Sequence, residues 1–366
     1  MYIDIPDLIN LAEISGLGPT RIRSLIAKFR SASQVFKAGK NELCGVEGID
    51  VKIAESIKTY RDFDFGKKQV DRLDACGGRI FTFWDEEYPA ILKSIYDPPV
   101  MLYVKGDFLD QDRYALGIVG TRQPTNYGKL VTEKLSKALV NLGITIVSGL
   151  ARGVDTIAHS AAVSGGGRTL AVIGSGIDVI YPAENKGLVS KIVENGAIIS
   201  EFPMGAAPDA GNFPRRNRII AGLTLGTVVT EAGQRSGALI TTSFALDYNR
   251  EVFAVPGNVN SSKSIGPNEL IKAGAKLVCD VDDIIAEISS KIAPYLNGKP
   301  AAARSYDELN EFEQEILAIL EDNPVHIDVI SRKLKRTTSD ILACLLKLEF
   351  NDIVKQLPGK QFVRMM

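Results

Sequence analysis

The stretch ALGIVGTRQPTNYGKLVTEKLSKALVNLGITIVSGLARGVD, residues 115–155, decides the fold class. It contains two short apolar runs, 115–119 and 144–148, which are separated by a longer helical stretch. Each run leads directly into a glycine-containing loop. A strand, a helix and a second strand in this order are typical of a parallel sheet covered by helices. We therefore expect an α/β fold.

The same alternation continues from about residue 75 to residue 290. Five further segments read as buried strands: TLAVI (169–173), AIIS (197–200), TVVT (227–230), VFAV (252–255) and KLVC (276–279). Most of them end in small or glycine-rich loops. We predict a mostly parallel sheet with helices on both faces, in a domain that covers residues 66–290.

Two different regions flank this domain. Residues 1–65 read as helical, with two short glycine turns, and residues 291–304 (KIAPYLNGKPAAAR) read as a linker because they lack apolar periodicity. Residues 305–366 predict three helices and a hairpin around Pro358-Gly359, which is typical of a winged helix. Its third helix has Lys347 as its only interior base, so protein binding and duplex DNA binding both stay open for this region.

The N-terminal turns resemble helix-hairpin-helix motifs. Residues 16–18 and 45–48 both have the pattern Gly-x-Gly or a close variant, and each leads into a helix. Such turns can present backbone N–H groups to a phosphate. The first turn is followed by Arg21, Arg23, Lys28 and Arg30, which suits DNA, whereas the second contains Glu47. A role as plain helix connectors stays open for both turns.

The composition limits the function classes. The chain has 366 residues, 45% hydrophobic and 24% charged, and a net charge of −1, so any nucleic-acid site must be local rather than a broad basic face. The acidic N-terminus does not read as a signal peptide and no apolar run is long enough to span a membrane. The four scattered cysteines fit a reducing compartment and form no zinc motif. We therefore expect a cytoplasmic protein without a metal.

The loops after the strands predict the functional site, because ligands of open parallel sheets bind at the carboxyl ends of the strands. Arg122 and Arg152 follow the first two strands, and FPRRNR (213–218) opens a helix. Guanidinium groups suit bidentate contacts to phosphate, and Phe213 can stack on a base. Alternatively, the glycines only serve tight turns, and Arg122 forms a salt bridge with Asp155 or Glu231.

Two nucleotide-binding fingerprints fail, so we predict no cofactor. Gly174-Ser175-Gly176 lacks the third glycine of the dinucleotide motif, and Tyr181-Pro182 interrupts the helix that should follow. The segment Gly120…Gly128-Lys129-Leu130 has the wrong glycine spacing for a P-loop, and Leu130 replaces the magnesium-binding hydroxyl.

A series of motifs, in a fixed order across about 190 residues, resembles the DprA (Smf) DNA-processing family. The motifs are DPPVMLYVKG (97–106), IVGTR (118–122), SGLARGVDTIAH (148–159), VIGSGIDVIYPAEN (172–185), FPRRNRIIAGL (213–223), EAGQRSGALITTSFALDYNREVFAVPG (231–257) and GPNELIKAGA (266–275). Thr121 stands where the family often has Ser, which keeps the hydroxyl.

The resemblance implies an extended Rossmann-like domain that binds single-stranded DNA, protects incoming DNA and helps to load RecA recombinase in natural transformation. It also implies a homodimer through this domain. Together, the loops and the motifs mark these DNA-binding candidates: Gly120, Thr121, Arg122, Gly149, Arg152, Gly153, Phe213, Arg215, Arg216, Asn217, Arg218, Gly233, Ser236 and Gly237. Replacing Arg122 or Arg218 should flatten the salt dependence of binding by about one charge each.

We expect no covalent chemistry and no catalytic residue, but one enzyme class stays open. The sheet also resembles nucleotide phosphoribohydrolases of the LOG type, in which a carboxylate acts on the sugar bond, and Glu231 is placed for that role. The phosphate loop of that group is absent here. His159 is the one histidine of the domain, and we predict that it packs locally.

Overall fold

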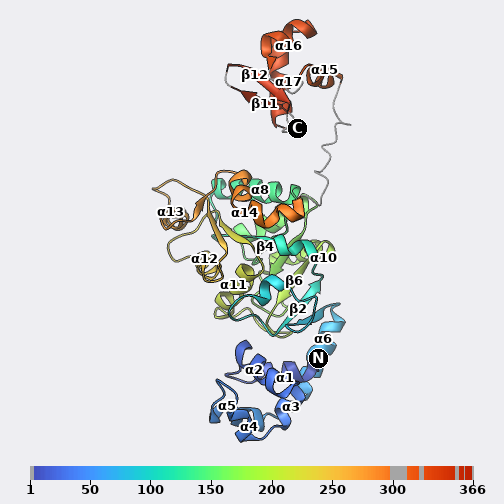
Figure 1. Ribbon diagram of the computed structural model, residues 1–366, viewed down its shortest axis with the longest axis vertical. Helices are drawn as coiled ribbons and strands as arrows, with labels where there is room; N and C mark the ends of the chain where they lie inside the picture. The colour runs from blue at the N-terminus through green and yellow to red at the C-terminus, as the bar shows by residue number, and fades with distance from the viewer. Residues whose placement is uncertain (1–3, 297–310, 321–324, 351–353, 358, 365–366) are drawn as a thin grey trace. The chain divides into compact units, whose positions relative to one another are not determined.

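The computed structural model describes residues 4–296, 311–320, 325–350, 354–357 and 359–364 (Figure 1). The chain divides into two compact units, residues 1–298 and 299–366. The first unit contains both the N-terminal helices and the central sheet.

The central sheet has nine strands, in the order β1-β2-β6-β5-β4-β3-β7-β8-β9. Their bounds are β1 Arg79–Thr82, β2 Met101–Gly106, β3 Leu116–Val119, β4 Ile146–Ser148, β5 Thr169–Val172, β6 Gly196–Ser200, β7 Gly226–Val229, β8 Glu251–Ala254 and β9 Lys276–Leu277. Strands β3 to β9 pair in parallel, and β1 and β2 join antiparallel at one edge. The α/β fold is confirmed, and the seven predicted strands all form.

The strand order reverses between β3 and β7. From β3 the chain winds outward through β4, β5 and β6, and it then returns to place β7 on the other side of β3. The register of these two strands pairs Leu116 with Gly226 and Val119 with Val229. The loops after β3 and β7 therefore begin side by side at the same edge of the sheet. This topological switch point is where open α/β sheets bind ligands.

Helices cover both faces of the sheet (Figure 1). One face packs on α8 (Asn126–Asn141), α9 (Val154–Ser164) and α14 (Val281–Leu296), through a core that includes Ile118, Leu139 and Ile288. The other face packs on α7 (Ala90–Lys93) and α11 (Asn212–Gly222), through Val119, Leu92 and Ile220. The remaining elements of this domain are η1 Asp110–Tyr114, η2 Ala183–Asn185, α10 Lys186–Glu194, α12 Gly237–Asp247 and α13 Ile265–Lys272.

Six helices precede the sheet: α1 Ile5–Glu13, α2 Pro19–Phe29, α3 Ala32–Lys37, α4 Lys40–Cys44, α5 Val51–Thr59 and α6 Asp64–Ala75. Gly16 and Gly48 take positive φ angles of 86° and 80° in the turns before α2 and α5, so both predicted helical hairpins form. Their basic side chains are largely used within the protein. Arg21 donates to Gly16 O, Arg23 to Pro98 O and Lys28 to Glu42 O.

The second unit contains α15 (Glu311–Ile319), β10 (Val325–His326), α16 (Ile327–Leu334), α17 (Thr338–Phe350), β11 (Val354–Leu357) and β12 (Gln361–Arg364). Strand β12 pairs with both β10 and β11. The predicted winged helix is confirmed, and β10 is an element that the sequence did not indicate. His326 caps α16, because its Nδ1 accepts from the N–H of Asp328.

One boundary differs from the prediction. The linker was predicted to begin at residue 291, but α14 continues to Leu296. Ile284, Ile288 and Ile292 are spaced four residues apart and are fully buried, so burial of this stripe extends the helix. Residues 297–304 lie outside the described residues. Among the described helices, none is both long and apolar enough to cross a membrane.

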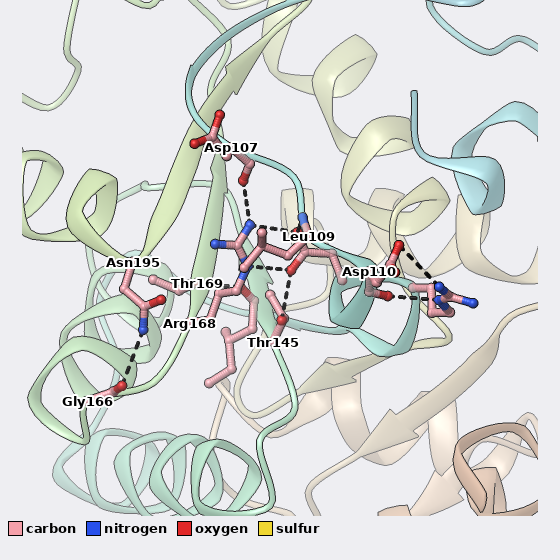
Figure 2. Close-up of polar contacts among 11 residues, drawn as sticks. Asp107, Leu109, Asp110, Thr145, Gly166, Arg168, Thr169 and Asn195 are labelled. Carbon is pink, nitrogen blue, oxygen red and sulfur yellow. Dashed lines mark hydrogen bonds and ion pairs between the residues drawn. The ribbon is translucent and has the colours of Figure 1, made fainter. Parts of the chain in front are cut away.

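A buried ion pair closes the amino ends of the central strands (Figure 2). Arg168, just before β5, donates from Nε and Nη2 to the two carboxylate oxygens of Asp112, at 2.7 Å each. Thr145, just before β4, donates to the same carboxylate, and Arg168 also bonds to the Asp107 carbonyl. Both charged side chains are more than nine-tenths buried. The charge of Arg168 is therefore neutralised within the protein.

Candidate nucleic-acid interface

An open cavity of about 410 Å³ lies at the switch point, at the carboxyl ends of β3 and β7. It brings together nine of the predicted site residues: Gly120, Thr121, Arg122, Phe213, Arg216, Asn217, Gly233, Ser236 and Gly237. They come from the loop after β3, the start of α11 and the loop between β7 and α12. This cavity, which we call the switch-point cavity, is where the predicted loops converge.

Arg122 is an exposed cation of this cavity. Its guanidinium lies 5.5 Å from the centroid of the Phe213 ring, and it forms no ion pair with any residue that the structure describes. The predicted alternatives, salt bridges to Asp155 or Glu231, do not form among these residues. Arg122 also lines two smaller spaces, one with Arg152 and Tyr181 and one with Lys129 and Arg152. A free cation thus lies where three hollows meet.

Arg216 forms the floor of the cavity. Its side chain is buried, it donates from Nη1 to Val172 O, and its Nε has no partner among the described residues. Burial lowers the pKa of Arg216 to about 10, although Asp155 opposes this shift. Burial likewise raises the pKa of Asp155 to about 6, against the attraction of Arg216. The cavity therefore contains two buried groups of opposite charge, Arg216 and Asp155.

The predicted glycines fall into two groups. A Cβ at Gly149 would lie 2.0 Å from Nη1 of Arg216, and one at Gly153, whose φ is +79°, would meet the Thr121 carbonyl at 2.4 Å. A Cβ at Gly120 would contact Val154 at 2.6 Å. These three glycines make room for the protein itself. In contrast, nothing described lies within 4 Å of a Cβ at Gly237, and at Gly233 the nearest atom is 3.7 Å away. Only Gly233 and Gly237 leave backbone open to a ligand.

Glu231 lies at the N-terminus of α8. Its two carboxylate oxygens accept from the N–H and the hydroxyl of Thr125, at 2.8 and 2.6 Å, and the side chain is buried. A Cβ at Gly128 would lie 2.2 Å from Glu231 Oε2, so the carboxylate sits directly over the first turn of α8. This helix end is where Rossmann-type proteins hold a phosphate. Here the protein fills it with its own anion.

The other predicted arginines lie outside the switch-point cavity. Arg152 is exposed and forms a bidentate pair with Glu184. Arg215 is exposed, lies 4.0 Å from Glu201 and contacts the Phe202 ring. Arg218 was predicted to face the DNA, but it is buried between Asp97 and Glu201, because its position on α11 turns it toward these two carboxylates. Arg218 is therefore not a free cation.

Two cations of the cavity were not predicted. Arg235 is exposed in the loop between β7 and α12, and Lys263 reaches the cavity from the loop before α13. Arg235 lies inside the EAGQRSG motif, so its position was the available signal. Lys263 had no such signal, because its contribution depends on the hydrogen bond between Ala232 N–H and Lys263 O, which joins two distant loops.

His159 packs internally, as predicted. It is fully buried, and its Nδ1 lies 2.7 Å from the Thr169 hydroxyl. Burial and the charge of Arg216 lower the pKa of His159 to about 3.

These features define a class: a Rossmann-like protein with an open cationic cavity at its switch point, in which the protein's own Glu231 carboxylate occupies the first turn of α8. Residues 79–289 match the family model described as DNA recombination-mediator protein A, and residues 300–360 match the DprA winged helix domain. The chain belongs to the DprA (Smf) family.

Individual relatives agree with this assignment. The chain is 35% identical to Protein Smf of Synechocystis sp., over 96% of this chain and 97% of that protein. It is similar to the crystal structure of DNA processing protein A from Streptococcus pneumoniae, with a TM-score of 0.69 and 35% identity, over 78% of this chain and 99% of that one. It also resembles the Helicobacter pylori DNA processing protein A in a structure that describes its single-stranded DNA binding mode. That match has a TM-score of 0.53 and 31% identity, over 58% of this chain and 96% of that one.

Proposed function

We propose that this protein binds single-stranded DNA at the switch-point cavity, protects incoming DNA and helps to load RecA recombinase during transformation and recombination. The observation that carries the proposal is the free guanidinium of Arg122, which lies at the junction of three hollows and faces Phe213. A cation without a protein partner, beside an aromatic ring, suits a phosphate next to an unpaired base.

The cations form a path rather than a point. Arg122, Arg235 and Lys263 line the switch-point cavity, and Arg122 also lines a second hollow together with Lys129. A chain of phosphates can follow such a path, with each phosphate contributing a weak contact that salt screens. This arrangement supports binding of several nucleotides with little dependence on base identity.

A homodimer through the Rossmann-like domain is part of the proposal. Its support is the exposed edge of the sheet, where β9 carries Leu277 with 41% of its surface exposed. Val259 and Leu246, from neighbouring segments of the same domain, are also exposed. Exposed apolar side chains on an unpaired edge strand favour association with a second copy.

We infer that the protein does no covalent chemistry. The LOG-type alternative needs Glu231 as a free catalytic carboxylate, whereas both of its oxygens are bonded to Thr125. Incubation with nucleoside monophosphates tests this point directly. Base release by the wild type that is lost in Glu231→Gln would establish the enzyme instead.

The binding proposal is tested by fluorescence-polarisation titration of single- and double-stranded oligonucleotides at two salt concentrations. We expect the single strand to bind more tightly, with an affinity that falls steeply as salt rises. Equal affinity for both forms, or no retention of any oligonucleotide, would contradict the proposal. The RecA role is tested by the rate of RecA filament assembly on DNA covered with single-strand-binding protein, with and without this protein.

A further inference from the structure

Helix α6 contacts the two loops that carry the aromatic rings beside Arg122. One loop, residues 173–182, follows β5 and contains Tyr181. The other loop, residues 201–211, follows β6 and leads into α11, where Phe213 lies. The two ring centroids are 6.2 Å apart, and both rings line a hollow together with Arg122. The position of the rings therefore depends on how the two loops are held.

Gln69 of α6 bonds to the main chain of the second loop at two points. Its Oε1 accepts from the N–H of Met204 at 2.6 Å, and its Nε2 donates to the carbonyl of the same residue at 3.4 Å. Both residues are buried, so loss of the amide would leave two polar groups of the main chain without a partner. The helix is itself held by α1, because the N–H of Gly66 donates to the buried Oδ1 of Asn10 at 2.7 Å.

An ion pair joins the same helix to both loops. Arg72 Nε donates to Oδ2 of Asp178 in the first loop at 2.6 Å. The other carboxylate oxygen, Oδ1, accepts from the N–H of Gly205 in the second loop at 2.8 Å. The Arg72 side chain is half exposed, whereas only 16% of the Asp178 side chain is exposed. One carboxylate thus connects α6 and the two loops at a single point.

The loops also bond to each other close to the rings. The N–H of Gly176 donates to Ala206 O at 3.0 Å. The ring of Phe213 packs on Gly174, where a Cβ would lie 3.1 Å from Cδ1 of the ring. A shift of either loop would therefore displace this ring. None of the described residues that line the three hollows around Arg122 belongs to α6, so the helix acts from outside the site.

We infer that Gln69, Arg72 and Asp178 are positioning residues for DNA binding, which keep Tyr181 and Phe213 in place without contacting the strand. This inference rests on the proposed binding of single-stranded DNA. A site whose loops are fixed before the ligand arrives loses less conformational freedom on binding, and it therefore binds more tightly. The affinity should depend on these residues, whereas the number of phosphate contacts should not.

Asp178→Ala is the sharpest test, because charge and position predict opposite results. If charge alone decides, removal of an acid strengthens the binding of a polyanion. Loss of its two bonds instead loosens both loops, and we expect the full-length variant to bind an oligothymidylate about tenfold more weakly in a polarisation titration. The salt slope should equal that of the wild type. Asp74→Ala is the matched control, because Asp74 is an exposed acid of α6 whose side chain bonds to neither loop among the described residues, and it should not weaken binding.

Arg72→Ala and Gln69→Met break the other two links. Removal of the half-exposed Arg72 should affect folding little and weaken oligothymidylate binding about threefold, without a change in salt slope. Arg72→Lys keeps a cation for Asp178 and should bind like the wild type. A urea melt of each variant shows whether it folds. If Gln69→Met does not fold, the variants of Arg72 and Asp178 still decide the question.

The inference is overturned if Asp178→Ala and Arg72→Ala fold and bind the oligothymidylate as tightly as the wild type, or more tightly. A flatter salt slope in Arg72→Ala that Arg72→Lys restores would make Arg72 a phosphate contact instead of a positioning residue. If the wild type binds no single strand, the proposed function itself fails. That result differs from wild-type binding that these variants leave intact.

Discussion

The two ends of the central sheet both carry arginines, yet they use them in opposite ways. At the amino ends, Arg168 gives three hydrogen bonds to Asp112 and the Asp107 carbonyl and is closed off from water (Figure 2). At the carboxyl ends, Arg122 is exposed and has no carboxylate partner among the described residues. The residue type is the same, and what differs is whether the protein neutralises the charge itself.

This difference separates a structural arginine from a binding one. Removal of one partner of a buried ion pair strongly destabilises the fold, because the other charge stays buried without compensation. Removal of an exposed guanidinium has little effect on folding. Arg218 shows that position alone is not a guide, because it lies on the helix that borders the cavity and is nevertheless paired with Asp97 and Glu201. Variants of single residues can show whether a side chain stabilises the fold or contacts DNA.

The largest effect should come from Arg168→Met. The change leaves the Asp112 carboxylate buried with only the Thr145 hydroxyl as a remaining side-chain donor, and we expect the free energy of unfolding to fall by about 3–5 kcal/mol. Urea denaturation measures this loss. The double variant Arg168→Met/Asp112→Asn should recover part of it, and single-stranded DNA affinity of the folded fraction should not change. A DNA-binding defect with normal stability would show that Arg168 contacts DNA rather than stabilising the fold.

Arg218→Met should also act on stability rather than on binding. Glu201 is mostly buried and would lose its close partner, so we expect a loss of about 2–3 kcal/mol in the free energy of unfolding. The salt slope of DNA binding should equal that of the wild type. A slope that flattened as much as in an Arg122 variant would return Arg218 to the set of phosphate contacts.

His159 makes the fold sensitive to acid. Its folded pKa of about 3 lies below the ordinary 6.5, so the unfolded chain binds a proton that the folded chain refuses, and stability falls as the pH decreases below 6.5. Between pH 6.5 and 5 this amounts to about 2 kcal/mol, at roughly 1.4 kcal/mol per pH unit. His159→Asn should remove this loss, as measured by urea melts at each pH.

Asp155 acts in the opposite sense, because its raised pKa of about 6 adds stability as the pH falls through 6. This contribution is shared by the wild type and the His159 variant, so it cancels when their stabilities are compared at one pH. His326→Asn is the matched control, since His326 is the other histidine of the chain and lies only partly buried at the start of α16. An equal change in both variants would show that His159 does not cause the acid sensitivity.

The smallest effect in energy should come from Arg122→Ala. We expect about a tenfold loss of single-stranded DNA affinity, or ~1.4 kcal/mol, for all sequences alike. The slope of log affinity against log salt should decrease by about 0.7, the value for one phosphate contact on a single strand. Arg113→Ala is the control, because Arg113 is also exposed but lies before β3, beside Asp110. An equal loss of DNA affinity in the control would mean that the effect does not depend on the position of Arg122 at the switch point.

The sequence predicted the sheet because its strands are buried on both faces and read as continuous apolar runs. All seven appeared, with ends displaced by one or two residues. The two antiparallel strands β1 and β2 were not predicted. RIFT is a short run, and MLYVKG was quoted only as part of a family motif although its first four residues are apolar and buried. The end of α14 was misplaced because its last turn lies in a segment whose alanines and proline resembled a linker.

The site was predicted in part. The loops after β3 and β7 converge as the strand order requires, so Arg122, Gly233 and Gly237 follow from topology. The pairing of Arg218 does not, because Asp97 and Glu201 come from segments 121 and 17 residues away and only the fold brings them to α11. Lys263 was missed for the same reason. Which side chains form ion pairs depends on their distances in the folded protein, and these distances cannot be read from the order of residues in the sequence.

The carboxylate of Glu231 above the first turn of α8 has a consequence for selectivity. Free nucleotides are abundant in cells, and a sheet of this topology with an empty helix end would capture them by their terminal phosphates. With that end already filled, a mononucleotide loses this phosphate site, whereas a long polyanion can contact several cations of the switch-point cavity and the hollow beside it at once. On the proposed binding of single-stranded DNA, we therefore expect the protein to prefer a strand to free mononucleotides.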